Sequence, residues 1–300
     1  MKKKTYLFAL MAMALTLGSC SDNENGIGGE TSKYITVSTS IGNMTRVATD
    51  EKGGQTFEEG DEISVYAWTG DATVAPETRE RVVNNAINKL TNGSWVSTPQ
   101  MLWKNNRDKH YFIGVYPISA ISDLSAGEYT FDETKQVESD LLVAVNKDGL
   151  SYNVDEQQPV PLTFTHVMAK LAVNLTYKNQ WGGIPTVEKV VVGNAAKEAT
   201  INYLTKVVTP SATAKEDFSL PEITENTKYV SVIIPQEDVK QLTIVIGGKN
   251  FVYDNGTPFK LESGKITTVN LEVGRDEIKL GDVKITDWEN GSTFSGEALN

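Results

Sequence analysis

From Lys33 onward, hydrophobic and polar residues alternate in short segments along most of the chain. A segment such as Glu62–Trp68 has apolar side chains at every second position, which is the period of a β-strand with one buried face. The segments end at Gly, Pro, Asn or Asp, which favour turns. The strands predicted in this way are 34–41, 62–68, 110–116, 162–167, 170–175, 187–192, 229–234, 242–246, 266–273 and 283–285.

Residues 77–90 allow two interpretations. An amphipathic helix would place Val82, Ala86 and Leu90 on one apolar stripe. The dipeptide Asn92-Gly93, however, lies between two apolar runs and is a strong signal of a two-residue hairpin turn. We therefore favour a pair of strands over a helix in this region.

Many short strands separated by turn residues predict an all-β protein built from β-sandwiches. The strongest break in the pattern is at residues 158–161, where Pro159 and Pro161 cannot donate hydrogen bonds to a sheet. We therefore expect an N-terminal β-sandwich domain over 33–161 and a C-terminal β-sandwich domain over 162–300. Both have ordinary domain lengths.

The N-terminus has the pattern of an export signal. Three lysines, Lys2–Lys4, precede an apolar run over 6–17, which is shorter than the roughly 20 residues needed to span a bilayer. Residues 17–20 read Leu-Gly-Ser-Cys, which looks like a lipobox, and Cys20 is the single cysteine of the chain. We expect a signal peptide over 1–19, lipidation of Cys20, and a polar, glycine-rich tether over 20–32.

Composition excludes several classes of function. The chain has 300 residues, with 28 Lys and Arg against 39 Asp and Glu, which gives a net charge of −11. An acidic surface repels phosphate backbones, so no nucleic-acid partner is expected. One Cys and two His cannot build a disulfide framework or a Cys-rich or His-rich metal site. We expect neither a metal nor a cofactor.

No catalytic constellation is recognisable in the sequence. It lacks the G-x-S-x-G nucleophile elbow, the G-x-G-x-x-G fingerprint and the phosphate-binding P-loop. His166 is expected to be a structural residue at a strand or domain junction, and His110 a solvated turn residue at the start of a strand. We therefore predict that the protein is not an enzyme and has no catalytic residues.

Trp181 is the candidate for a ligand-stacking side chain. It lies in a predicted loop, Asn179–Gly183, where an exposed indole could stack on a sugar. This suggests an alternative function, a monomeric surface lipoprotein that binds glycans.

An ordered set of phrases resembles a known family. They are the lipobox, then TRV at 45–47, FEEGDEISVY at 57–66, YP at 116–117, SDLL at 139–142, LTFTHVMAKL at 162–171, IPQ at 234–236 and ITDW at 285–288. Together they resemble the fimbrillin-like family of Bacteroidales lipoproteins, the subunits of type V pili. The acidic residues just after Cys20 are similar to the surface-export signal of such lipoproteins, which implies exposure on the outer membrane.

The resemblance implies two transthyretin-like β-sandwich domains in tandem and a role in adhesion. It implies that a protease releases the first strand and that a strand of another pilin subunit replaces it. The matching positions are Arg46 and Val47 for cleavage, Tyr34, Ile35, Val37 and Ile41 for the released strand, and Phe294, Gly296 and Ala298 for a donor strand. The implied partners are other pilin subunits, outer-membrane lipid through Cys20, and a surface receptor or glycan. Shaft, tip and anchor positions all remain open.

Overall fold

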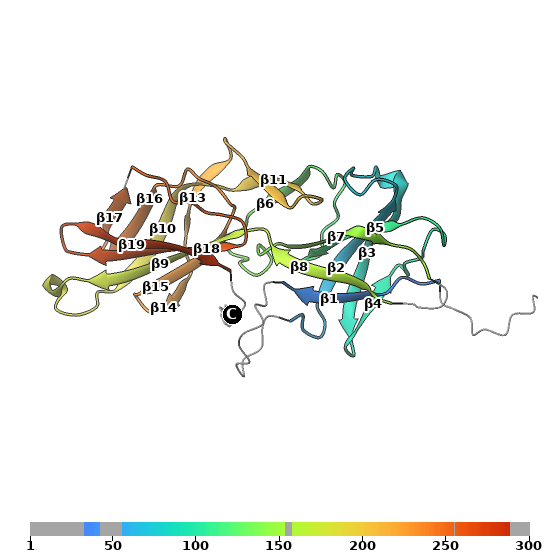
Figure 1. The fold of residues 1–300 in the computed structure, drawn as a ribbon. Helices are drawn as coiled ribbons and strands as arrows, with labels where there is room; N and C mark the ends of the chain where they lie inside the picture. Colours follow the sequence, from blue (N-terminus) through green and yellow to red (C-terminus); the bar gives the residue numbers. More distant parts are fainter. Residues whose placement is uncertain (1–32, 43–55, 154–157, 255, 289–300) are drawn as a thin grey trace, which may run out of the picture. The chain divides into compact units, whose positions relative to one another are not determined.

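The computed structural model describes residues 33–42, 56–153, 158–254 and 256–288. Within these ranges the regular structure is β-strand, apart from two short 3-10 turns, η1 (Thr78–Glu80) and η2 (Asn179–Trp181). The strands form several sheets (Figure 1). The all-β prediction is therefore confirmed. None of these segments contains a helix long and apolar enough to cross a bilayer.

The first sheet contains seven strands from the N-terminal half of the chain. Their order across the sheet is β1 (Val37–Ile41), β8 (Val160–His166), β7 (Leu142–Leu150), β5 (His110–Tyr116), β2 (Glu62–Thr69), β3 (Arg81–Thr91) and β4 (Ser94–Thr98). The two edge strands, β1 and β4, lie close to each other. A hydrogen bond of 3.0 Å from Trp95 Nε1 on β4 to Thr39 Oγ1 on β1 shows this. The sheet is therefore rolled around its inner face.

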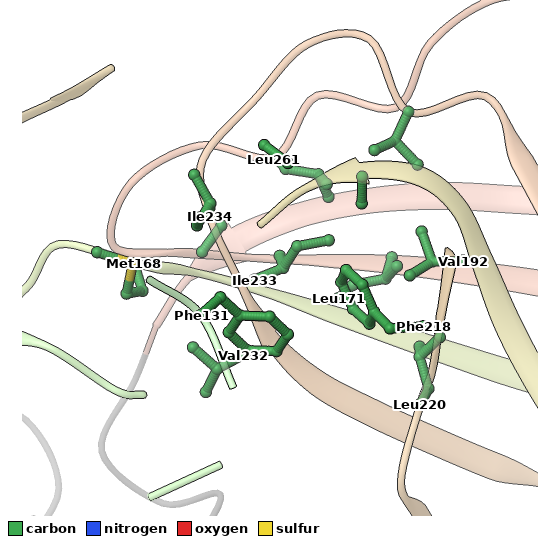
Figure 2. Packing of buried hydrophobic residues seen from close by; sticks show 14 of the residues in the cluster. Phe131, Met168, Leu171, Val192, Phe218, Leu220, Val232, Ile233, Ile234 and Leu261 are labelled. Carbon is green, nitrogen blue, oxygen red and sulfur yellow. The ribbon is translucent and has the colours of Figure 1, made fainter. Parts of the chain in front are cut away.

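Two sheets of the C-terminal half pack face to face. One has the order β14 (Glu222–Thr224), β15 (Lys228–Ile233), β9 (Ala169–Tyr177), β18 (Lys265–Val273) and β19 (Ile278–Asp287). The other has the order β13 (Lys215–Ser219), β10 (Val187–Ala196), β16 (Gln241–Ile246) and β17 (Lys249–Asp254). Side chains from both sheets, among them Leu171 and Val192, share the hydrophobic cluster seen in Figure 2.

A small sheet joins the two halves of the chain. The hairpin of β11 (Glu198–Asn202) and β12 (Val207–Pro210) pairs through β11 with β6 (Gly127–Thr130). At the hairpin tip, Tyr203 is buried and its N–H donates to Leu124 O at 2.9 Å. One continuous cluster of buried side chains, the main cluster, runs from Tyr66 of the first sheet through Tyr203 into the two C-terminal sheets.

The change from the first sheet to the C-terminal sheets falls a few residues after the proline break. Strand β8 runs from Val160 to His166 and pairs with β1 and β7, so it includes Pro161 and crosses the predicted boundary at 161/162. The next strand, β9, begins at Ala169 in the other sheet. A division into two domains remains a prediction.

The structure resolves the ambiguity at residues 77–90 in favour of strands. After η1, β3 and β4 form an antiparallel hairpin. Its turn residues Asn92 and Gly93 have φ values of 51° and 73°, which the left-handed turn requires. The predicted hairpin is confirmed.

Candidate functional site at the first strand

Strand β1, the candidate released strand, lies at an edge of the first sheet. It pairs in parallel with β8, from Val37 opposite Val160 to Ile41 opposite Phe164. Ahead of it, Ile35 N donates to Met101 O at 2.9 Å, and Trp103 N donates to Lys33 O at 3.2 Å. The segment is therefore held by β8 over most of its length and by residues 101–103 at its start.

Alternate side chains of this segment enter the core of the first sheet. Ile35, Val37 and Ile41 are 1%, 6% and 8% exposed, whereas Tyr34 is 51% exposed. The three aliphatic side chains belong to the first-sheet cluster, a set of buried residues on the inner face of the rolled sheet. Its members are Ile35, Val37, Ile41, Ile63, Val65, Ala67, Val83, Ala86, Met101, Phe112, Leu142, Ala144, Val160, Leu162 and Phe164.

A groove of ≈ 700 Å³ follows the outer edge of β1. The far wall of this groove is formed by Leu90, Ser94 and Trp95 at the β3–β4 hairpin. Trp95 spans the groove through its hydrogen bond to Thr39. Among the described strands, none pairs with the outer edge of β1, which lines this groove instead.

Phe57 also lines this groove. Its ring meets the rings of Trp95, Tyr116 and Phe164 edge-on, at centroid distances of 5.3, 5.3 and 5.1 Å. This geometry is favourable for aromatic pairs. It attaches the chain directly after 43–55 to the first-sheet core, independently of β1.

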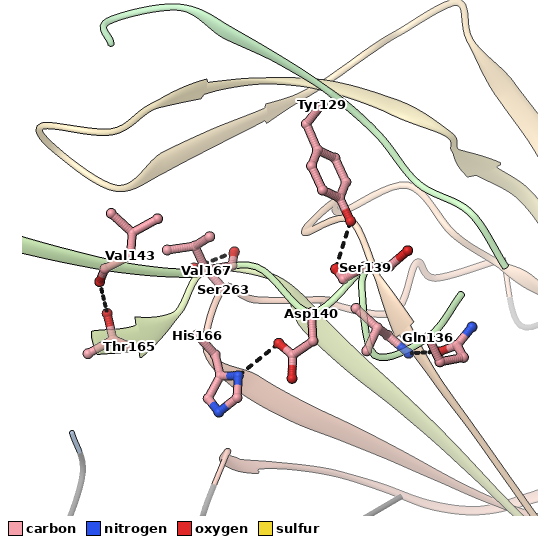
Figure 3. A network of polar contacts seen from close by, with 10 residues as sticks. Tyr129, Gln136, Ser139, Asp140, Val143, Thr165, His166, Val167 and Ser263 are labelled. Atoms are coloured by element: carbon pink, nitrogen blue, oxygen red, sulfur yellow. Dashed lines mark hydrogen bonds and ion pairs between the residues drawn. The ribbon is translucent and has the colours of Figure 1, made fainter. Parts of the chain in front are cut away.

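A second pocket, of ≈ 440 Å³, begins beside Ile41 and contains several charged side chains. His166 Nδ1 lies 2.8 Å from Asp140 Oδ1 in its wall (Figure 3), and the imidazole stacks on Trp288 at 4.1 Å. Lys170 lies in the same wall with its Nζ 4.0 Å from the Trp288 ring. Burial lowers the pKa of Lys170 to about 8, although the negative charge of Asp140 acts in the opposite direction and raises it. His166 thus lies where β8 ends, at a strand junction, and a structural role for it remains a prediction.

Tyr116 supplies a neutral polar group to the same pocket. Its hydroxyl donates to Asp61 Oδ1 at 3.3 Å. Burial and this carboxylate raise the pKa of Tyr116 to about 12, so the phenol stays protonated at neutral pH. Across the described ranges, no group of three or more His, Cys, Asp and Glu side chains could hold a metal ion.

Trp181 lies in η2, in a loop as predicted, but its indole is half-buried. Its Nε1 donates to Val273 O at 3.0 Å, and its ring meets Phe251 at 5.9 Å. Arg275 lies 5.6 Å from the ring centroid. The indole is thus engaged in packing, and stacking on a ligand remains a prediction.

Several predicted site residues lie outside the described residues. They are Cys20, Arg46, Val47, Phe294, Gly296 and Ala298. The structure brings together Ile35, Val37 and Ile41, and adds three residues that were not singled out, Thr39, Phe57 and Trp95. Strand periodicity alone could have found Thr39, since it shares the inward face with Val37 and Ile41.

Comparison with known proteins gives the family. The class that the fold defines is an all-β protein with an edge strand that completes its core. The model of the family described as "Fimbrillin-like" matches residues 45–288. This match covers most of the chain, so the protein belongs to the fimbrillin-like family, and the resemblance found in the sequence is confirmed.

Individual relatives agree with the family. The chain is 25% identical over 323 residues to a Bacteroides uniformis protein named "Putative fimbrium subunit Fim1C", covering 99% of this chain and 100% of that protein. Two solved structures, each described as a "putative cell adhesion protein", have the same fold at 18% identity. The one from Bacteroides ovatus has a TM-score of 0.65 and covers 85% of this chain and 98% of its own. The one from Bacteroides uniformis has a TM-score of 0.63 and covers 86% and 100%.

Proposed function

We propose that this protein is a structural, non-enzymatic subunit of a cell-surface type V fimbria, in a shaft, tip or anchor position, and that it supports adhesion. It is exported as a lipoprotein attached to the outer membrane through Cys20. Cleavage between Arg46 and Val47 then releases the first strand, and a strand from another subunit takes its place. The name of the Bacteroides uniformis relative supports the fimbrial role.

The observation that carries this proposal is the edge position of β1. The first-strand segment, residues 34–41, contributes three buried aliphatic side chains, but among the strands that the structure describes β1 pairs with β8 alone. Removing it would expose the backbone edge of β8 and the pockets of Ile35, Val37 and Ile41. Such a groove recognises an extended strand through main-chain hydrogen bonds and alternate side chains. Each buried aliphatic side chain is worth about 1.5–3 kcal/mol, so the vacated groove binds a replacement strand favourably.

Phe57 supports the same mechanism from the other side of the cut. Because its aromatic contacts hold the chain after residue 55 to the first-sheet core, loss of residues before Val47 leaves that attachment in place. The remainder of the first sheet is then retained while its edge is open.

The test is polymer formation by an uncleavable variant. Arg46→Ala should accumulate as a precursor and form no fibres on the cell surface, as judged by high-mass species on gels of unboiled, sheared surface material. Arg79→Ala is the matched control, because Arg79 is an exposed arginine on η1, away from β1, and should leave assembly unchanged. An Arg46→Ala precursor that polymerises normally would contradict the proposal.

A further inference from the structure

The hydrogen bond between Trp95 and Thr39 gives the groove a sequence requirement that apolar packing alone would not impose. The inward positions of the first strand are Ile35, Val37, Thr39 and Ile41, so one hydroxyl interrupts a row of aliphatic residues. The Thr39 Oγ1 accepts from Trp95 Nε1 at 3.0 Å, with both side chains partly buried. An indole N–H is a donor only, and it loses its partner if the opposite residue has no acceptor.

This contact also fixes the register. A strand displaced by two residues would keep its inward face but place an aliphatic side chain against the Trp95 N–H. The displaced hydroxyl would enter a pocket made for Val37 or Ile41, where no such donor is described. Both changes leave polar groups poorly paired, which costs more than the hydrogen bond itself contributes. A correctly placed strand therefore has Ser or Thr at the third inward position.

A glycine follows the last inward position. A Cβ on Gly42 would lie 2.9 Å from Thr163 Cγ2, closer than van der Waals contact allows. The Gly42 N–H also donates to Phe164 O at 2.7 Å, so the backbone is held against β8 at this point. A side chain here would have to displace the Thr163 methyl group.

We propose that the strand accepted by this groove has the alternate pattern apolar, apolar, Ser or Thr, apolar, followed by Gly, and that Trp95 is the residue that reads the hydroxyl. This inference rests on the proposed strand exchange and specifies its partner. The C-terminal segment 289–300 has no register, in either direction, with a Ser or Thr at that position and large apolar residues at the other three. Residues 289–300 of a second copy therefore do not fit this pattern, and the occupant that we propose is a strand of a different polypeptide that carries it.

The experiment uses the full chain with a specific protease site introduced between residues 47 and 52, cut once so that the first strand stays bound without a covalent link. Labelled peptides with the sequence of residues 34–42 are then exchanged into it and followed by fluorescence anisotropy. The native peptide and its Thr39→Ser version should bind, whereas Thr39→Val should bind about tenfold more weakly, the size of one lost hydrogen bond. Thr36→Val is the matched control, because Thr36 faces solvent, and it should bind like the native peptide.

A cut chain carrying Trp95→Phe should no longer distinguish the native from the Thr39→Val peptide. A peptide of residues 289–300 should not bind. Equal binding of the native and Thr39→Val peptides to the unaltered groove, or binding of the 289–300 peptide as tight as the native one, would overturn the inference.

If even the native peptide fails to enter the groove, strand exchange itself is contradicted. The hydrogen bond from Trp95 to the Thr39 hydroxyl is then tested on the uncut chain. There, Thr39→Val and Trp95→Phe are combined in a double-mutant cycle of denaturant midpoints. The second substitution should cost little once the first is present. Fully additive effects would overturn the role of Trp95.

Discussion

His110 is one of the two histidines of the chain, and its burial is the main departure from the sequence-based expectation at the scale of single residues. It was expected to be solvated at a turn, and that expectation is wrong, because the residue is 0% exposed at the start of β5. Its Nε2 accepts the Lys104 N–H at 3.0 Å, and its Nδ1 lies 3.0 Å from Asp108 O. Two backbone groups, which no side-chain pattern reveals, therefore hold the ring in one neutral tautomer.

Burial lowers the pKa of His110 below its ordinary value of 6.5, so the unfolded chain binds a proton more readily than the folded one. The stability that this contributes is present above pH 6.5 and is lost as the pH falls through the folded pKa. We predict that the urea midpoint falls between pH 7.5 and 5.5, and that His110→Gln, though less stable, shows a shallower fall. An unchanged pH dependence in His110→Gln would contradict this assignment.

The inward residues of the first strand differ in how far the sequence reveals them. Alternation identifies Ile35, Val37 and Ile41 as buried, and the structure agrees. The hydrogen bond from Trp95 to Thr39 could not be predicted, because the two residues are 56 positions apart and meet only when the sheet rolls. Local pattern gives the face of a strand, whereas the identity of its distant neighbour depends on tertiary packing.

At the scale of elements, β1 tests the packing account most simply, because neighbouring residues point to opposite faces. Val37→Asp would bury an unpaired carboxylate in the first-sheet cluster and should cost about 3 kcal/mol or more of unfolding free energy. Ser38→Asp changes the exposed neighbour and should alter it by about 0.5 kcal/mol or less. The two variants are compared by denaturant titration. A similar loss in both would show that β1 is not packed with this face inward.

Several strands of the structure were not predicted. β7 was missed, since Leu142, Val143 and Ala144 are buried on both faces and residues 146–148 are polar, so no period of two remains. β11 and β12 are short and take their place from pairing with β6, which lies about 70 residues earlier in the chain. At such positions the partner strand, rather than the β-propensity of the segment itself, decides whether a strand forms.

At the scale of the whole molecule, the main cluster connects the first sheet to the C-terminal sheets through the β11–β12 hairpin. The fit at the hairpin tip is close, because a Cβ on Gly127 would lie 2.5 Å from the Tyr203 ring. Continuous packing of this kind should make residues 33–288 unfold as one cooperative unit. The sequence predicted strands on either side of the proline break but could not predict this connection, because it depends on contacts between residues far apart in the chain, such as the pairing of β6 with β11 and the hydrogen bond from Val232 N to Gln136 Oε1.

We therefore predict a single unfolding transition, with coincident midpoints by far-UV circular dichroism and tryptophan fluorescence. Tyr203→Ala should lower stability by about 3–5 kcal/mol, as expected for removal of a buried aromatic ring. It should also make the midpoints by circular dichroism and by tryptophan fluorescence differ. Thr205→Ala, at an exposed position of the same hairpin, should do neither. Two separate transitions in the unaltered protein would contradict a continuous core.

Assembly by strand exchange requires that the first strand be removed before the subunit assembles. The most direct measurement is N-terminal sequencing and intact mass of the protein in fibres sheared from the cell surface. The mature chain is expected to begin at Val47. Assembled material in which every chain still begins at lipidated Cys20 would contradict it.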